Sequence, residues 1–221
     1  VAGIIHTVND NISDRIDYEK TSSKIAFGKN KINEKILNLN FEISMSSFFQ
    51  TNPLCAEKLY KKVIDYASID TNEKPIILDL FCGTGTIAQL IASQHKDTHV
   101  IGVDIVASAI TNAKTSAIKN KIKNIDFYAL DINKFLIEKP ELKNQINTII
   151  VDPPRPGIAK KSLKKIIELN ANTIIYVSCN PSTQARDIEI LISANYIIKK
   201  FSIADQFPHT QHIETIFILI K

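Results

Sequence analysis

The chain has 221 residues, of which 44% are hydrophobic and 23% charged, and this is the composition of an ordinary globular protein. Its formal net charge of +4 permits an RNA partner without demanding one. No apolar run reaches the roughly 18 residues that a membrane span requires, and no basic segment precedes an apolar one as in a signal peptide. We therefore expect a cytoplasmic protein without a membrane partner.

The first 45 residues alternate short strand-like segments with polar turns and contain no site motif. The strand-like segments are residues 2–8, 24–27 and 40–43. We interpret residues 1–45 as the remnant of a β-rich domain, central or N-terminal, and residues 46–221 as an α/β domain. A helix is expected to begin near Pro53.

From residue 75 onward, apolar strands alternate with helical patterns, which is typical of a parallel α/β sheet. The predicted strands are residues 76–80, 99–104, 126–130, 148–152 and 173–178, and the predicted helices are residues 87–92, 107–120, 160–169 and 183–194. The alternation of strands and helices ends near the C-terminus, where two strands are predicted at residues 196–203 and 214–220 with only a loop between them. We expect these two strands to pair antiparallel. This pattern predicts the seven-stranded, mostly parallel, Rossmann-like sheet of class I S-adenosylmethionine-dependent methyltransferases rather than a dinucleotide-binding fold.

The turn after the first of these strands has the composition of a cofactor site. Gly83 and Gly85 let the backbone approach a ligand closely, and the helix that follows offers unpaired N–H groups. Asp104 ends the next strand, where a carboxylate can bind both hydroxyls of a ribose. Asp79 suits the cationic methionine end of S-adenosylmethionine and would repel a pyrophosphate. S-adenosylmethionine is therefore favoured over a nicotinamide dinucleotide.

Two further aspartates follow later strands. Asp131 either lies near the adenine of the cofactor or caps the segment after it, and both interpretations stay open. Asp152 begins the segment DPPRPG, whose prolines fix the backbone so that its polar groups can be held against a flat base. Arg155 stands where methyltransferases acting on exocyclic amines carry an aromatic residue. An arginine can pair a phosphate or an oxygen-rich base edge, so amine methylation is less favoured.

Cys179 follows the fifth strand directly, at the sheet edge that faces the cofactor cleft. Cys55 and Cys82 are interpreted as buried small hydrophobes, and three widely spaced cysteines argue against a disulfide framework or a zinc site. The N-terminus of the following helix favours a thiolate at Cys179. A thiolate that adds to C6 of uracil makes C5 nucleophilic enough to accept a methyl group, and a base must then remove the C5 proton. Glu214 is the candidate base, although a carboxylate at a strand boundary is more often a solvated end residue.

Five motifs in this order resemble the RNA uridine-C5 methyltransferase family, which forms 5-methyluridine in tRNA and ribosomal RNA. They are SFFQTNP at residues 47–53, DLFCGTG at 79–85, DPPR at 152–155, VSCNP at 177–181 and FPHTQHIE at 207–214. The resemblance covers about residues 46–221, which it identifies as a catalytic domain. It implies that Cys179 is the nucleophile and Glu214 the base.

The resemblance also implies the binding residues. The cofactor contacts are Gln50, Phe81, Thr86, Asp104 and Asp152, to which the turn and strand ends add Gly83, Gly85 and Asp131. The resemblance also places Asp152 near the target base, and Arg155 and Asn180 are the further substrate contacts that we expect. Read alone, the two phenylalanines before Gln50 look like an apolar staple for the helix near Pro53.

Members of that family usually carry an N-terminal oligonucleotide-binding barrel, and some carry a cysteine-bound iron–sulfur cluster, whereas this chain shows the motifs of neither. We expect S-adenosylmethionine as the cofactor, no metal or iron–sulfur cluster in this chain, and a monomer. The expected partner is RNA, and the spellings FFQ and FPHT favour 23S ribosomal RNA. The alternatives are a tRNA uridine, an amine or cytosine methyltransferase on the same fold, and a catalytically silent cofactor-binding fragment.

Overall fold

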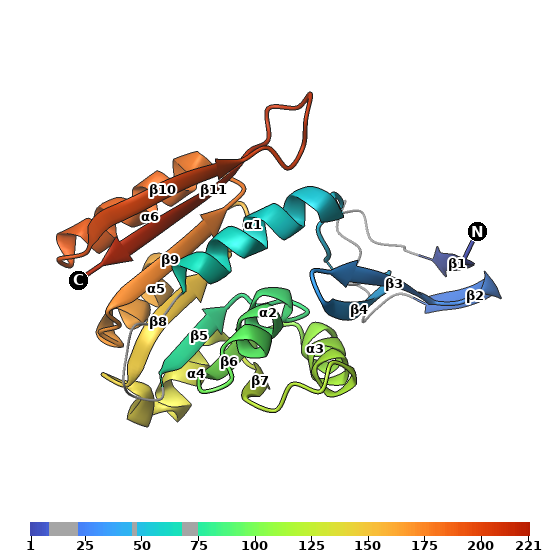
Figure 1. The fold of residues 1–221 in the computed structure, drawn as a ribbon, viewed down its shortest axis with the longest axis horizontal. Coiled ribbons are helices and arrows are strands. Elements are labelled where there is room, and N and C mark those ends of the chain that lie inside the picture. Colours follow the sequence, from blue (N-terminus) through green and yellow to red (C-terminus); the bar gives the residue numbers. More distant parts are fainter. Residues whose placement is uncertain (9–21, 46–47, 68–74) are drawn as a thin grey trace.

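A seven-stranded sheet forms the centre of the computed structural model, which describes residues 1–8, 22–45, 48–67 and 75–221 (Figure 1). The strand order is β10-β11-β9-β8-β5-β6-β7. The parallel strands are β5 (Ile76–Leu80), β6 (His99–Asp104), β7 (Ile125–Ala129), β8 (Ile146–Val151) and β9 (Thr173–Ser178). The last strand, β11 (Glu214–Ile220), lies between β9 and β10 (Ile197–Ala204) and is antiparallel to both. The predicted mostly parallel sheet with its antiparallel C-terminal hairpin is therefore confirmed.

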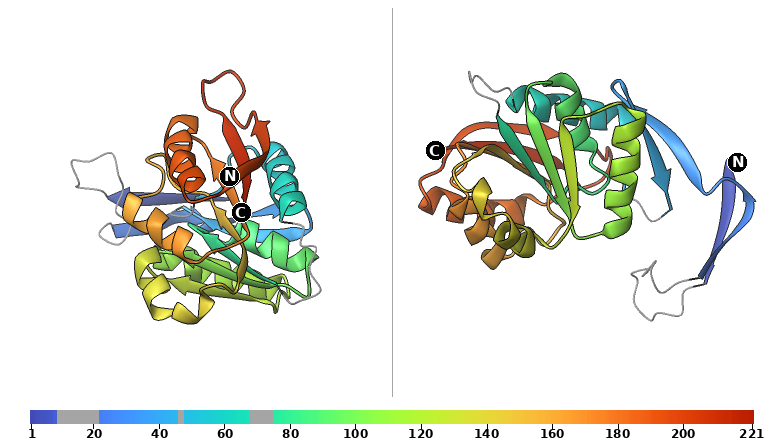
Figure 2. Two further views of the ribbon diagram at one scale, coloured as in Figure 1. Left: turned by 90° about the vertical axis from the view of Figure 1, so that its left-hand side faces the viewer. Right: turned by 90° about the horizontal axis from the view of Figure 1, so that it is seen from below.

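Helices cover both faces of the sheet, as the views in Figures 1 and 2 show. One layer contains α1 (Pro53–Tyr66), α2 (Thr86–Gln94) and α3 (Ala107–Lys119), and the other contains α4 (Ile132–Glu138), α5 (Lys160–Glu168) and α6 (Pro181–Ser193). Successive residues of the central strands feed the two cores, since Ile175 of β9 packs in the first and Tyr176 in the second. Both faces being covered explains the continuous apolar runs of these strands. Within the described ranges, no helix is long and apolar enough to cross a bilayer.

Some element boundaries differ from the prediction for identifiable reasons. Helix α6 begins at Pro181 instead of residue 183, because the Asn180 side chain caps it by accepting the N–H of Ser182 at 3.2 Å. Helix α4 was predicted only as a segment that Asp131 might cap. Sequence reasoning missed strand β3 (Lys31–Ile36), because its charged residues hide the alternation of apolar and polar residues that marks a strand. Antiparallel pairing with β4 (Leu39–Ser44) makes it a strand in the structure.

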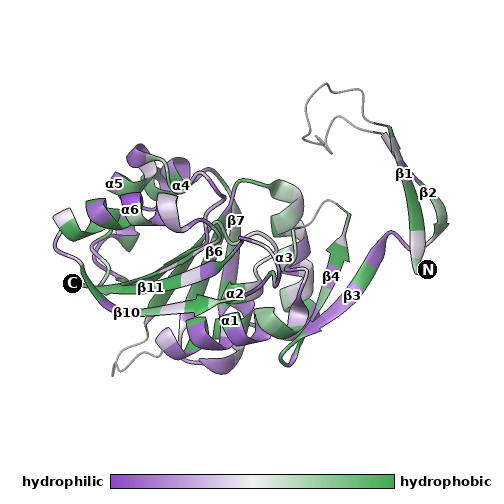
Figure 3. Cartoon of the chain, turned by 90° about the horizontal axis from the view of Figure 1, so that it is seen from above, coloured by the Kyte–Doolittle hydropathy of each residue, from purple (hydrophilic) through white to green (hydrophobic). Residues whose placement is uncertain are grey.

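The N-terminal region forms two hairpins that differ in how they are packed. At the end of the β3–β4 hairpin, Ile36, Leu39 and Phe41 are buried in the core that α1 covers. The hairpin of β1 (Gly3–Val8) and β2 (Ser22–Gly28) stands clear of the sheet and its helices (Figures 1 and 2). It carries hydrophobic segments all the same (Figure 3), and Ile25 and Phe27 of β2 are exposed.

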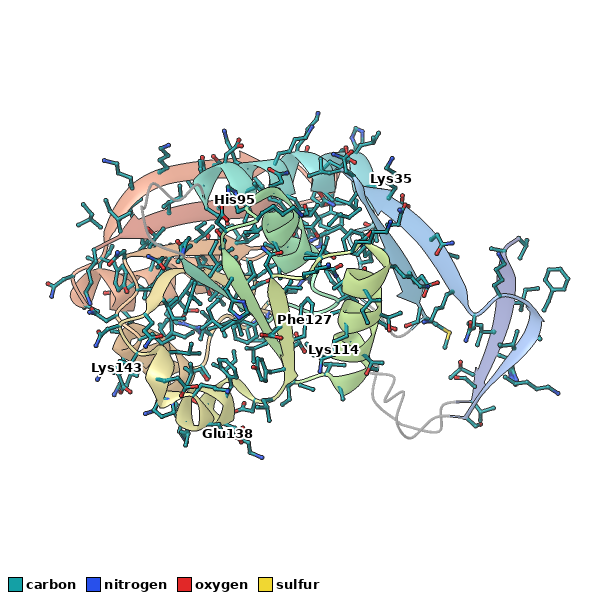
Figure 4. All side chains as sticks on the ribbon, turned by 60° about the horizontal axis from the view of Figure 1, so that its bottom comes forward. Lys35, His95, Lys114, Phe127, Glu138 and Lys143 are labelled. Atoms are coloured by element: carbon teal, nitrogen blue, oxygen red, sulfur yellow. The ribbon has the colours of Figure 1, made fainter. Side chains whose placement is uncertain are left out.

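One aromatic ring determines how closely the first βα turn approaches the sheet. Phe127 of β7, labelled in Figure 4, is buried where Gly85 and Gly102 leave room for it. A Cβ atom on Gly85 would lie 2.5 Å from the ring, and one on Gly102 would lie 2.6 Å from it. Because real Cβ atoms do not approach so closely, the two glycines and Phe127 form one packing unit.

We predict that Gly102→Ala lowers the free energy of unfolding by about 1–3 kcal/mol, because the added methyl group overpacks this site. Phe127→Leu removes part of the obstacle, so Gly102→Ala should cost less in that background. Urea denaturation of the two single variants and the double variant measures the difference. An equal cost in both backgrounds would show that the ring is not the obstacle.

Candidate active site

A cavity of about 630 Å³ opens at the carboxyl ends of the parallel strands. This volume lies within the range of small-molecule and cofactor sites. Ten of the predicted site residues line it: Gln50, Phe81, Gly83, Thr86, Asp104, Asp131, Asp152, Arg155, Cys179 and Glu214. The two others do not line the cavity. Gly85 precedes α2 with a left-handed backbone, φ 72°, and Asn180 caps α6.

The glycine turn fits a ligand held close to the backbone. Gly83 has a φ of 53°, and a Cβ atom there would meet nothing within 4 Å, so open space lies against this residue. Phe81 also has a positive φ, 64°, which is unusual for a residue with a side chain. The Gly83 N–H donates to Oδ2 of Asp104 at 2.9 Å, and the Val106 N–H donates to Oδ1 at 2.8 Å. These two bonds fix the orientation of the Asp104 carboxylate at the cavity wall.

Asp79 provides a buried acceptor at the floor of the cavity. Its side chain is 1% exposed, and Oδ2 accepts the Ala88 N–H at 3.1 Å. Oδ1 is buried and has no hydrogen-bond partner among the described residues. Burial and the nearby charge of Asp152 hold the pKa of Asp79 well above its usual range. A ligand cation reaching Oδ1 would satisfy this atom.

The cavity is strongly acidic. Its lining includes the carboxyl groups of Asp79, Asp104, Asp131, Asp152 and Glu214, and the one cation on it is Arg155, among the described residues. Desolvation by burial raises the pKa of Asp152 to about 6. A ligand with two positive charges, such as the sulfonium and ammonium of S-adenosylmethionine, fits this lining, whereas a pyrophosphate would be repelled.

Asp131 caps α4, which is one of the two interpretations that the sequence left open. Its Oδ1 accepts the N–H groups of Asn133 at 2.9 Å and Lys134 at 3.3 Å, so the side chain caps α4. The same residue also lines the cavity. The capping bonds hold the carboxylate at the end of β7, where it can contact a ligand.

Strand pairing places Glu214 beside Cys179. Thr215 of β11 lies opposite Ser178 of β9, so the residue before Thr215 and the residue after Ser178 are at the same edge. Glu214 is only 3% exposed, and its interpretation as a solvated end residue is wrong. Burial, aided by the charge of Asp152 and opposed by that of Arg155, raises the pKa of Glu214 to about 7. A carboxyl group with this pKa can exchange a proton near neutral pH.

The surroundings of Cys179 correct one expectation. The Ser178 Oγ accepts the Asn180 N–H at 3.0 Å, and this tight turn presents the half-buried Cys179 to the cavity. Burial and the charges of Glu214 and Asp152 raise the pKa of the thiol, whereas Arg155 lowers it. The helix N-terminus therefore does not dominate, and Arg155 is the group that favours the thiolate.

The other cysteines and the first motif also need correction. Cys55 and Cys82 are partly exposed rather than buried, and Cys82 lines the cavity. Phe48 is exposed and lines the cavity, so it is not a staple, whereas Phe49 packs on Phe41 with ring centroids 5.9 Å apart. Ser46 and Ser47, at the start of the resemblance, lie outside the described residues.

Tyr60 and Gln206 are among the residues of the site that sequence reasoning missed. Tyr60 is buried in α1 and lines the cavity, but nothing in its neighbourhood in the sequence distinguishes it from a core residue. Gln206 is buried, and its Nε2 donates to Oε1 of Gln50 at 3.3 Å. This bond joins the loop between β10 and β11 to the cofactor side of the cavity.

The sequence matches known proteins over most of its length. Residues 11–221 match the family described as tRNA (Uracil-5-)-methyltransferase. A protein of Clostridium acetobutylicum, described as an uncharacterized RNA methyltransferase, is 42% identical over 217 residues, which are 98% of this chain and 46% of that protein. A protein of Caldanaerobacter subterraneus with the same description is 39% identical over 221 residues, which are 100% of this chain and 47% of that protein. The chain thus spans about half the length of these relatives.

A solved structure matches nearly the whole chain. It is the crystal structure of Pyrococcus abyssi tRNA (uracil-54, C5)-methyltransferase in complex with S-adenosyl-L-homocysteine. The TM-score is 0.81 and the sequence identity 32%, and the match covers 99% of this chain and 51% of that chain. This likeness confirms the predicted class I S-adenosylmethionine-dependent methyltransferase fold.

The buried Glu214 predicts a specific dependence of stability on pH. Its pKa is about 7 in the folded protein against an ordinary 4.5, so folding favours the protonated form. The stabilising contribution of that form is present at pH 5 and is lost as the pH rises through about 7. Glu214→Gln, which cannot ionise, should gain stability relative to the wild type between pH 5 and pH 8, on the order of 2–3 kcal/mol. Urea denaturation at both pH values measures it, and a constant difference would contradict the assigned burial.

Proposed function

The chain belongs to the tRNA (uracil-5-)-methyltransferase family, and we propose that it forms 5-methyluridine in RNA from S-adenosylmethionine through a covalent adduct of Cys179. The observation that carries this proposal is the placement of Cys179 and Glu214 together on one cavity, with β11 supplying Glu214. A thiol beside a carboxyl group of pKa about 7 is the pair that methylation at C5 of uracil needs.

The residues on the β5–β6 side of the cavity fit the cofactor. Asp79 would accept the ammonium group, Asp104 the ribose hydroxyls, and Gly83 would allow close approach of the ligand to the backbone. Gln50, Phe81, Thr86 and Asp131 complete the lining of this side. When bound, S-adenosylmethionine supplies an electrophilic methyl group on its sulfonium. The structure from Pyrococcus abyssi contains S-adenosyl-L-homocysteine, the product that remains after such a transfer, and this supports the same cofactor here.

Cys179 begins the proposed reaction. Its thiolate adds to C6 of the uracil, and the electrons of the C5–C6 double bond move into the carbonyl to form an enolate. C5 of this enolate is then nucleophilic enough to take the methyl group. Arg155 supports the step because its positive charge lowers the pKa of Cys179 against the opposing charges of Glu214 and Asp152. Asp152 and Arg155, on the same loop, are the proposed contacts to the base, together with Asn180.

Glu214 ends the proposed reaction. Its carboxylate removes the proton from C5, the C5–C6 double bond forms again, and the bond between C6 and sulfur breaks to return the thiolate. Because burial raises the pKa of Glu214 to about 7, its carboxylate is a stronger base than an ordinary glutamate and is still ionised in part at neutral pH.

Two kinds of RNA are candidates for the substrate. The spellings FFQ and FPHT favour 23S ribosomal RNA. A tRNA is the second candidate, because the protein from Pyrococcus abyssi that matches 99% of this chain acts on uracil 54 of tRNA. The relatives are about twice as long as this chain, so their remaining residues can contribute to the choice of RNA.

We predict that Cys179→Ala lowers the rate of methyl transfer by about a thousandfold or more. The other thiol of the lining, Cys82, does not replace it, because burial holds the pKa of Cys82 well above its usual range. The binding of S-adenosyl-L-homocysteine, measured by calorimetry, should be unchanged. Transfer from radiolabelled S-adenosylmethionine to transcripts of 23S ribosomal RNA and of tRNA measures the rate and distinguishes the two substrates. A variant that still methylates either RNA at the wild-type rate would refute the proposed nucleophile.

Glu214→Gln should accumulate a covalent complex with RNA, because the adduct forms but cannot lose its C5 proton. A band of enzyme bound to RNA on a denaturing gel measures the complex, and Cys179→Ala in the same chain should abolish it. The wild type should release tritium from RNA that contains 5-tritiated uridine. Methylation without tritium release would point to the alternative, an amine or cytosine methyltransferase.

A further inference from the structure

The loop that carries Arg155 is held against the start of α6. The Asn180 Nδ2 and the Thr183 Oγ1 both donate to the backbone carbonyl of Arg155, each at 3.0 Å. The Gly157 N–H closes a turn by donating to the Pro154 carbonyl at 2.8 Å. Since Asn180, the residue after Cys179, caps α6, the loop and the thiol are attached to the same helix end.

An ion pair between the buried Asp187 and the exposed Arg186 fixes the far side of this loop. Asp187 of α6 is 1% exposed, and its Oδ2 accepts the Ile158 N–H and the Tyr176 hydroxyl, both at 2.7 Å. Its Oδ1 accepts from Nε of Arg186 at 2.9 Å and from Nη2 at 2.7 Å. The Arg186 Nη2 also donates to the Pro156 carbonyl at 3.1 Å. The pair therefore contacts the loop backbone on both sides of Gly157.

Gly157 shows how tightly the loop lies on this pair. Its φ is 76°, and a Cβ atom there would lie 2.7 Å from both the Arg186 Nη2 and the Asp187 Oδ2. A side chain at this position would push the loop away from α6. Because the Arg186 side chain is 46% exposed, solvent screens the ion pair, and its charges are weak evidence for a role in stability.

We propose that Asp187, together with Arg186, is a positioning residue that holds the loop of residues 152–158 so that Arg155 faces Cys179. The catalytic consequence rests on the proposed function, whereas the placement of Arg155 does not. Residues 153, 154 and 156 are prolines, so the loop is stiff, and an anchor at Ile158 constrains the position of Arg155.

The pKa of Cys179 provides a readout of this placement that does not depend on methylation. The charged groups that act on the thiol are Glu214 and Asp152, which raise its pKa, and Arg155, which lowers it. If Asp187→Asn acted only by removing a negative charge, it would lower the pKa of Cys179. If it releases the loop and Arg155 moves away, the pKa rises, so the two effects differ in sign.

The experiment measures the pH dependence of Cys179 alkylation by iodoacetamide. It is quantified on the Cys179 peptide by mass spectrometry, because Cys55 and Cys82 are also free thiols. Asp187→Asn should move the midpoint upward by at least about half a unit, toward that of Arg155→Ala. In the Arg155→Ala background, Asp187→Asn should add no upward shift. Glu189→Gln removes an exposed carboxylate from the same helix and serves as the matched control, with no upward shift expected.

Methyl transfer provides a second readout. Asp187→Asn should lower kcat by about 10- to 100-fold through misplacement of the loop, with the KM for S-adenosylmethionine unchanged. If the Cys179 midpoint shifts as expected but the wild type methylates no RNA, the proposed function is refuted and the positioning role is not. A folded Asp187→Asn variant whose midpoint stays or falls would overturn the positioning role.

Gly157→Ala covers the case in which Asp187→Asn does not fold. It keeps every charge and adds a Cβ atom 2.7 Å from both the Arg186 Nη2 and the Asp187 Oδ2, so it should displace the loop from the pair. An upward shift of the Cys179 midpoint is expected, and circular dichroism with S-adenosyl-L-homocysteine binding verifies that the variant is folded. No shift in this variant would overturn the proposal.

Discussion

The antiparallel pairing of β11 with β9 is the constraint on which the site depends. In a sheet of parallel strands alone, the residue that begins a strand lies at the opposite edge from the residues that end its neighbours. Because β11 runs the other way, its first residue, Glu214, reaches the edge where β9 ends before Cys179. The Thr215 Oγ1 reinforces this register by donating to the Gln184 Oε1 at 2.6 Å. The sheet topology thus places a thiol beside a buried carboxyl group.

The acidic cavity follows from the parallel part of the sheet, because an aspartate lies within two residues of the carboxyl end of four strands, at Asp79, Asp104, Asp131 and Asp152. Burial and mutual repulsion make the ionised form of these carboxyl groups unfavourable. The pKa values of Asp79, Asp152 and Glu214 are therefore raised. A cationic ligand relieves this repulsion, since an opposite charge at short range favours the ionised form of each carboxyl group. The cavity is therefore complementary to a cation in the way that a phosphate site is complementary to an anion.

The sequence predicts those parts of the fold and site that follow from local pattern. Apolar runs ending in Asp104 or before Cys179 locate strand ends, and strand ends in a parallel sheet share one edge, so these residues come together. Tyr60 and Gln206 could not be found this way, because only tertiary packing brings α1 and the β10–β11 loop to the cavity. The burial of Glu214 was missed for a related reason, since a boundary residue is buried only if other elements cover it. Strand β3 could not be predicted without knowing its pairing with β4, because its charged residues hide the alternation of apolar and polar positions.

The hydrogen bonds that hold the loop of residues 152–158 against α6 do what the stiffness of the loop alone cannot do, which is to keep Arg155 near Cys179. Prolines restrict the backbone angles of this segment, but a stiff loop attached only to β8 could still lean away from Cys179. Arg155 is exposed, and its Nη2 lies 3.4 Å from the ring nitrogens of His212, so the side chain has partners other than the thiol. Anchoring the loop to α6 through Asp187, Arg186, Asn180 and Thr183 ties Arg155 to the helix that begins after Cys179. If Asp187 positions the loop as proposed, the thiol stays beside the cation that lowers its pKa, which offsets the charges of Glu214 and Asp152 that raise it.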